Sequence, residues 1–194
     1  MSDIEIRRGN LFDIDEIIHI SEIYLKESYY NETSISDLTR YIRDNFNYSL
    51  LEKKLIDNNI YYYALTINNR IVGYYRLNDE NRITIIEQKD YLQLQYLFIL
   101  SEHQEESLYK EVLDKINFFA HQLKKDYVFT NLRENQTYLI NIYKNNGYEV
   151  FDNCDIFIGS QKVKNVLLRR KVNNWFIKEW IINLVMVKLL SYDK

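Results

Sequence analysis

The chain has 194 residues, of which 46% are hydrophobic and 27% are charged, as in ordinary folded soluble proteins. This length fits one domain, or one domain with an appendage, and it buries enough apolar surface to fold without disulfides. The net charge of −3 excludes a global basic field, so no nucleic-acid partner is expected.

The sequence contains no disulfide or metal-binding pattern. The single cysteine, Cys154, cannot form an internal disulfide and fits a reducing compartment. The histidines, His19, His103 and His121, lack metal-ligand spacing, so we interpret them as surface or half-buried residues and expect no metal. The N-terminus lacks the apolar stretch of a signal peptide, and a cytoplasmic location is the expectation.

The first part of the chain predicts a strand followed by helices. Apolar and polar residues alternate over Asp3–Arg8, which is typical of a half-buried strand. Apolar residues then recur at helical spacing over Asp13–Tyr29. A second helix is expected from Ser36, capped by Ser36 or Ser34, and residues 49–57 can add another turn or two.

The middle of the chain predicts a group of strands. Aromatic and β-branched residues fill Tyr61–Ile67. Asn68-Asn69 forms a two-residue turn, after which Ile71–Leu77 would return antiparallel. A further strand is expected over Leu92–Leu100.

The second half of the chain predicts helices that alternate with strands. Helices are expected over Gln104–Lys124 and over Asn135–Asn146, the latter ended by Gly147. Strands are expected at 127–131, at 148–152, which 155–158 can extend, and at 164–170. We expect the strands near Leu92 and Tyr127 to be parallel neighbours in one mixed sheet.

The order of these elements resembles the GNAT superfamily of acyl-CoA-dependent N-acyltransferases. Ile71–Leu77, with Gly73, resembles the third strand of that family, and Leu94–Gln104 resembles its fourth strand running into the CoA-binding loop. Ile142–Tyr148 resembles the family's helix that ends in a tyrosine, three residues, a glycine and an aromatic residue. The resemblance covers residues 3–171 and implies an α/β (α+β) GNAT-like mixed central sheet flanked by helices.

The resemblance also implies acetyl-CoA, or another acyl-CoA, as co-substrate. In the family the fourth and fifth strands splay apart, and the pantetheine arm pairs with the free backbone groups of the fourth strand. The pyrophosphate then binds at the N-terminus of the next helix. The implied contacts are Leu97, Phe98 and Ile99 for the arm and Gln104, Ser107, Leu108 and Tyr109 for the pyrophosphate.

The pyrophosphate loop departs from the family's pattern of Arg or Gln, two residues, Gly, one residue, then Gly or Ala. Gln104 and the small Ser107 are compatible with it, but Tyr109 replaces a small residue. Glu105 and Glu106 oppose an anion electrostatically, yet the same glutamates also stabilise a helix start without any ligand. Both interpretations stay open.

The resemblance assigns catalytic chemistry to Tyr143, which matches the position that returns a proton to the leaving thiolate. A core tyrosine that closes the helix against the sheet is the alternative. The oxyanion donor would be the backbone N–H of Phe98 or Ile99. Asn135 and Gln136 match a cofactor-contacting Asn seven residues before the Tyr, although Asn135 can equally be a helix cap.

No general base is evident from the sequence. Many relatives place a Glu on the fourth strand, where this chain has Gln95 and Tyr96. Glu87 precedes that strand and could act through water, or it is a solvated strand-edge residue. Two functions therefore stay open, an N-acyltransferase for a small-molecule or protein amine and a non-catalytic GNAT-like domain that binds a partner.

The composition changes after Lys171, so we divide the chain into a GNAT-like domain (1–171) and an apolar helical extension (172–194). The extension is shorter and more charged than the ~20 apolar residues that span a bilayer, and it is too apolar to stand in water. It packs on its own domain, pairs with another subunit or lies on a membrane surface. We rank a protein contact first, predict a homodimer, and rank peripheral membrane contact last.

Overall fold

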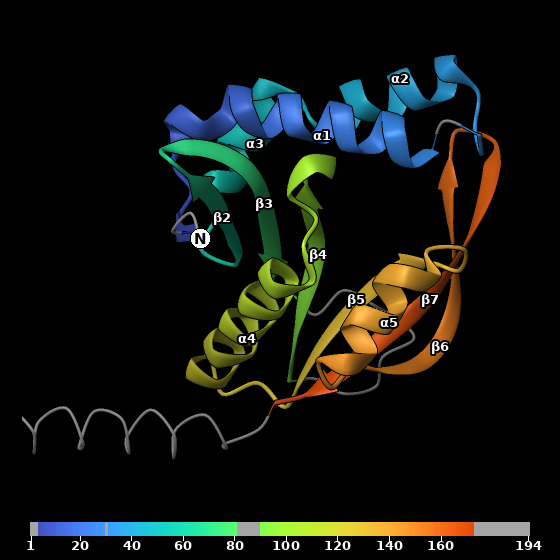
Figure 1. Cartoon of the computed structure of the whole chain (residues 1–194). Coiled ribbons are helices and arrows are strands. Elements are labelled where there is room, and N and C mark those ends of the chain that lie inside the picture. The colour runs from blue at the N-terminus through green and yellow to red at the C-terminus, as the bar shows by residue number, and fades with distance from the viewer. Residues whose placement is uncertain (1–3, 30, 81–89, 173–194) are drawn as a thin grey trace, which may run out of the picture.

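The computed structural model describes residues 4–29, 31–80 and 90–172. Within them the strands form one seven-stranded sheet in the order β1-β2-β3-β4-β5-β7-β6, and helices cover both faces of the sheet (Figure 1). The strands are β1 (Ile4–Arg8), β2 (Ile60–Ile67), β3 (Arg70–Asn78), β4 (Tyr91–Ile99), β5 (Tyr127–Arg133), β6 (Glu149–Ile158) and β7 (Gln161–Lys171). The helices are α1 (Ile14–Tyr29), α2 (Ile35–Asn45), α3 (Tyr48–Leu55), α4 (Glu106–Gln122) and α5 (Thr137–Asn145), with 3-10 turns at Leu11–Asp13 and Ser101–His103.

This architecture confirms the mixed α/β sheet predicted from the sequence. Ser34 is the cap of α2, and residues 49–57 fall largely within a separate helix, α3. The apolar extension from residue 173 onward lies outside the described residues, as does Glu87. The division into a domain and an extension therefore stays a prediction, as does the homodimer. No helix of the described part is long and apolar enough to cross a membrane.

The sheet separates two hydrophobic cores. Helices α1, α2 and α3 pack on one face, where buried residues include Ile17, Leu51, Tyr62, Tyr74 and Phe98. Helices α4 and α5 pack on the other face, where Leu77, Leu94, Val112, Ile116 and Val128 are buried. A sheet covered on both faces explains why β3 and β4 are buried along nearly their whole length.

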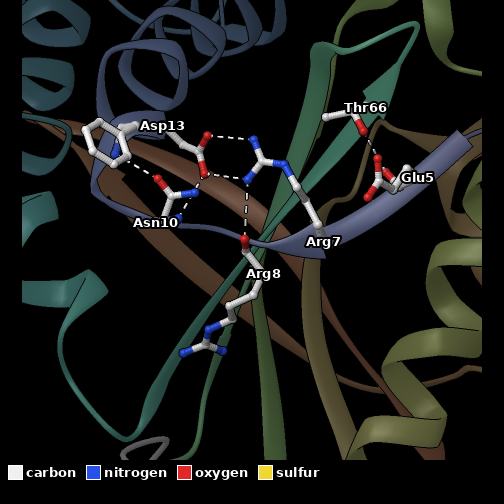
Figure 2. Close-up of polar contacts among 7 residues, drawn as sticks. Glu5, Arg7, Arg8, Asn10, Asp13 and Thr66 are labelled. Atoms are coloured by element: carbon white, nitrogen blue, oxygen red, sulfur yellow. Dashed lines mark hydrogen bonds and ion pairs between the residues drawn. The ribbon is translucent and has the colours of Figure 1, made fainter.

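A polar cluster fixes the angle at which α1 leaves β1 (Figure 2). The Arg7 guanidinium donates to both oxygens of the Asp13 carboxylate, at 2.8 and 2.7 Å. Asp13 also accepts from the backbone N–H of Asn10, while the Asn10 side chain accepts from the N–H of Phe12, which completes a capping box. Because Asp13 is buried, this pairing joins the first strand to the first helix.

Strands β4 and β5 are parallel neighbours, as predicted, but they pair over only a short stretch. Their partners are Tyr91 with Tyr127, Leu92 with Val128 and Gln93 with Phe129. Beyond Gln93 the strands diverge, and the open V between them is visible in Figure 1. The tip of the β6–β7 hairpin, at Gly159, packs against Asp37 of α2 and brings this hairpin close to the open side of the V.

A bulge lies in β4 where the divergence begins. Arg76 of β3 is opposite Tyr96, but Leu77 is opposite Leu94, so Gln95 is an extra residue in the ladder. The bulge shifts the alternation of the strand: Leu92 and Leu94 share the α4–α5 core with Leu97 and Ile99, whereas Tyr96 and Phe98 face α1–α3.

Candidate functional site

A cavity of about 230 Å³ occupies the space between the diverging strands. Helices α1 and α2 form one wall, β4 and β5 form the floor, and α5 with the β6–β7 hairpin forms the far wall. Among the residues that line it are Tyr24, Ser28, Tyr29, Tyr41, Gln95, Tyr96, Leu97, Phe98, Asn131, Arg133, Gln136, Tyr143, Ile156 and Asn165. The cavity thus collects side chains from distant parts of the chain.

The open edge of β4 presents unpaired backbone groups. The N–H of Leu100 donates to Val72 of β3 at 3.0 Å, and in an antiparallel ladder such bonds alternate along the strand. Phe98 therefore directs its backbone groups toward β3, while Leu97 and Ile99 direct theirs toward the gap left by β5. The carbonyl of Ile99 agrees with this direction, since it accepts from the Gln104 side chain at 2.8 Å.

Tyr143 comes from α5 and lines the same cavity as Leu97 and Phe98. Its ring packs edge-to-face on Tyr148, with the centroids 5.1 Å apart. Helix α5 ends just beyond it because Gly147 adopts a φ of +81°, and the Tyr143 carbonyl accepts from Tyr148 at 3.1 Å. Burial raises the pKa of Tyr143 well above its usual value, so the phenol keeps its proton at neutral pH.

The start of α4 combines free amides with acidic side chains. The backbone N–H groups of Leu108 and Tyr109 donate to the carbonyl of Glu105, at 3.1 and 3.2 Å, and both side chains are buried in the core. Glu106 and Ser107 keep free N–H groups among the described residues, as expected of a helix N-terminus. Glu105 and Glu106, which are next to these donors in the sequence, have exposed side chains.

Asn135 and Gln136 have different surroundings. The Asn135 side chain donates to Glu32 at 2.6 Å and caps no helix. Gln136 is the N-cap residue of α5 and lines the cavity, where its side chain also accepts from the N–H of Arg133 at 3.3 Å. Of the two, only Gln136 meets Tyr143 in the cavity.

Helices α1 and α2 contribute tyrosines that the sequence alone did not single out as site residues. The Tyr24 ring stacks on Phe98, with centroids 4.3 Å apart. Burial raises the pKa of Tyr29 to about 12 and also raises the pKa values of Tyr41 and Tyr96. Their only signal in the sequence is a position on the inner face of an amphipathic helix or strand. These phenols are neutral hydrogen-bonding groups at physiological pH.

Arg133 and Glu32 form an ion pair at the edge of the cavity, 2.6 Å apart. The guanidinium also lies 4.7 Å from the ring centroid of Tyr29. Because Glu32 neutralises Arg133, the cavity carries little net charge.

The histidines and the cysteine lie apart from this site. His19 is exposed, while His103 and His121 are half-buried, as predicted. Burial raises the pKa of the Cys154 thiol, with the charges of Asp155 and Asp152 acting in the same direction. Among the described residues, no group of His, Cys, Asp and Glu side chains could hold a metal ion.

The architecture matches solved acetyltransferase structures over most of the chain. A PaiA N-acetyltransferase from Thermoplasma acidophilum in complex with coenzyme A aligns with a TM-score of 0.70 at 17% identity, over 87% of this chain and 99% of that one. The protein has the GNAT fold.

Other solved GNAT-fold structures agree. A probable acetyltransferase from Staphylococcus epidermidis aligns with a TM-score of 0.70 at 16% identity, covering 88% of this chain and all of that one (100%). Mutant forms of the spermidine/spermine N-acetyltransferase SpeG from Vibrio cholerae align with a TM-score of 0.65 at 11% identity, over 91% and 98% of the two chains. No family model matches the sequence.

Proposed function

We propose that this GNAT-fold protein is an N-acyltransferase that moves an acetyl group from acetyl-CoA to an amine. One observation carries the proposal: the open backbone edge of β4 at Leu97 and the Tyr143 side chain share one cavity. Amine acylation needs a donor for the developing oxyanion and a proton for the leaving thiolate. A backbone N–H and a protonated phenol are groups of those two kinds.

The free edge of β4 also fits the amide-containing pantetheine arm. The backbone groups of Leu97 and the N–H of Ile99 have no partner strand in the described chain, and an extended amide chain could pair with them as an added strand would. The Ile99 carbonyl already accepts from the Gln104 side chain. The N–H groups of Glu106 and Ser107 would meet the pyrophosphate. Glu105 and Glu106 oppose that anion, so we expect weaker binding than at a glycine-rich loop.

Different residues of the chain have different roles in the proposed reaction. Acetyl-CoA supplies the electrophilic thioester carbon. The N–H of Leu97 donates to the thioester oxygen as negative charge develops there, and the acceptor nitrogen forms the new amide bond. As the C–S bond breaks, the Tyr143 hydroxyl gives its proton to the thiolate, and the proton lost by the amine restores the phenol through solvent.

Titration calorimetry and thermal denaturation with acetyl-CoA test the proposal. A ligand that binds the native state raises the melting temperature, and release of the CoA thiol in the presence of a panel of amines reports transfer. If millimolar acetyl-CoA produces no binding heat and no thermal shift, the proposal is rejected. That result would favour a non-catalytic GNAT domain, the alternative that the glutamates at the start of α4 support.

A further inference from the structure

The cavity between β4 and β5 has an unusual lining for a site that would receive a cation. Among its described lining residues there is no Asp, Glu, His or Lys, and the one charged side chain, Arg133, is paired with Glu32. An acceptor with several ammonium groups would have to leave water with no carboxylate to compensate its charges. Such uncompensated burial is strongly unfavourable.

Two buried amide oxygens in this cavity have no hydrogen-bond partner in the described structure. They are Oε1 of Gln95, the bulge residue of β4, and Oδ1 of Asn165 on β7. Buried polar atoms are satisfied in native proteins, and each of these oxygens lacks a donor. A ligand that brings N–H groups into the cavity would satisfy both.

The remaining walls of the cavity favour a ligand that is small and largely apolar. Tyr24, Tyr29, Tyr41 and Tyr96 line the cavity, and their phenols stay neutral at physiological pH. Ring faces attract a single ammonium group or an apolar body without requiring a counter-charge. The volume of about 230 Å³ is below the ~300–1,000 Å³ typical of pockets for drug-sized ligands, and the thioester end of acetyl-CoA would share this space beside Leu97 and Tyr143.

We propose that the acceptor is a small compound with one amine and no other charge, whose N–H groups donate to Gln95 and Asn165 while the tyrosines enclose its body. Polyamines are excluded as preferred acceptors. The inference rests on the proposed N-acyltransferase function, because it names the acceptor class of that same cavity. It makes Gln95 a specificity-determining residue.

Competition between benzylamine and spermidine tests this acceptor class. Binding of each amine to the full-length chain is measured by calorimetry without acetyl-CoA, and thiol release is measured separately with acetyl-CoA. We expect benzylamine to bind at least about tenfold more tightly than spermidine. Equal or tighter binding of spermidine, or binding of neither amine, overturns the inference.

A Gln95→Glu variant tests the role of the bulge residue. A carboxylate at this position should move the spermidine-to-benzylamine affinity ratio toward spermidine by roughly tenfold, because it pairs with an ammonium group. Gln161→Glu, on the exposed end of β7, is the matched control and should leave the ratio unchanged. An unchanged ratio in Gln95→Glu removes that residue from acceptor recognition.

The two measurements separate the failure of this inference from the failure of the proposed function. Benzylamine binding without thiol release, in a protein that binds acetyl-CoA, supports the acceptor class but contradicts the transferase reaction. Thiol release that is faster with spermidine than with benzylamine supports a transferase and overturns the acceptor class.

Discussion

Burial has two opposing effects on the phenol of Tyr143 as a proton donor. The ring is almost fully buried and its pKa is raised, so the group starts each turnover protonated, but the same shift makes it a weaker acid toward the thiolate. A tyrosine that served only to pack the core would be equally buried. Core packing and proton donation differ in whether the hydroxyl contributes to the rate of acyl transfer.

Replacing Tyr143 with Phe separates these roles. We expect kcat to fall by roughly 10²–10⁴-fold, the usual contribution of a positioned proton donor, while the Kd for acetyl-CoA changes little. Steady-state kinetics and calorimetry on the same preparation give both numbers. Tyr138→Phe, an exposed position on the same helix, is the control, and an undiminished kcat in Tyr143→Phe would assign Tyr143 to packing alone.

The second prediction at the scale of residues concerns the contribution of Asp13 to the stability of the fold. The Arg7 guanidinium lowers the pKa of the Asp13 carboxyl, so the pair stabilises the fold above the carboxyl's unfolded pKa and this contribution disappears as the pH falls through the lowered value. Asp13→Asn should reduce the free energy of unfolding by about 1–3 kcal/mol at pH 7.

Urea denaturation of the wild type and of Asp13→Asn across the acid pH range checks the direction of this pH dependence. The difference between wild type and Asp13→Asn should shrink once the pH falls below the lowered pKa, because both side chains are then neutral. Asp15→Asn, on the exposed side of α1, should show a smaller difference throughout. A difference that persists unchanged at low pH would contradict an ionic origin.

At the scale of elements, the contact between β3 and β4 sets the position of the open edge. A Cβ added at Gly73 would lie 2.7 Å from the carbonyl oxygen of Phe98 and 3.1 Å from the Cα of Ile99. Gly73→Ala should therefore displace β4 where the pantetheine arm is proposed to pair, weaken acetyl-CoA binding, and lower stability by about 1–3 kcal/mol.

Gly9→Ala provides a matched comparison for Gly73→Ala. Its added Cβ would lie 3.1 Å from Cβ of Tyr62, in a part of the sheet that does not touch β4. Both variants should melt at lower temperature, but only Gly73→Ala should lose affinity for acetyl-CoA in calorimetry. Equal affinities in the two variants would show that the edge of β4 does not bind this ligand.

Several elements could be predicted because local chemistry determined them. Asn68 and Asn69 adopt the positive φ values of a tight hairpin, 50° and 63°, and Gly147 ends α5 in the left-handed region. The bulge at Gln95 could not be predicted, because an extra residue in a ladder is visible only when the partner strand is in place. Sequence alternation alone would have assigned Leu94 and Tyr96 to the same face.

At the scale of the whole molecule, the cavity is lined by side chains from distant parts of the sequence. Tyr24, Gln95 and Asn165 are remote from one another in sequence and carry no shared motif, so only the assembled sheet brings them together. The family resemblance found Tyr143 because a local spacing to Gly147 marked it. No comparable local spacing in the sequence identifies the residues proposed to bind the acceptor.

The charges of the side chains that line the cavity predict how the reaction rate depends on pH. Since its described lining offers no carboxylate or imidazole as a base, an acceptor amine must arrive already deprotonated. The rate at subsaturating amine should rise with pH and level off near the pKa of the amine itself, while Tyr143 stays protonated. With two accepted amines of different pKa, the midpoint should move with the amine, and a common midpoint would reveal an enzymic base instead.

The bulge in β4 has a consequence for how this chain can vary in length. Because Gln95 is the extra residue in the ladder, its removal would make β4 a regular strand and leave the later side chains on their present faces. Leu97 and Ile99 would stay in the α4–α5 core with Leu94, and Tyr96 and Phe98 would stay toward α1–α3. Removal of Leu97 instead would exchange Phe98 and Ile99 between the two cores, so the fold should tolerate a one-residue deletion at Gln95 better than one at Leu97.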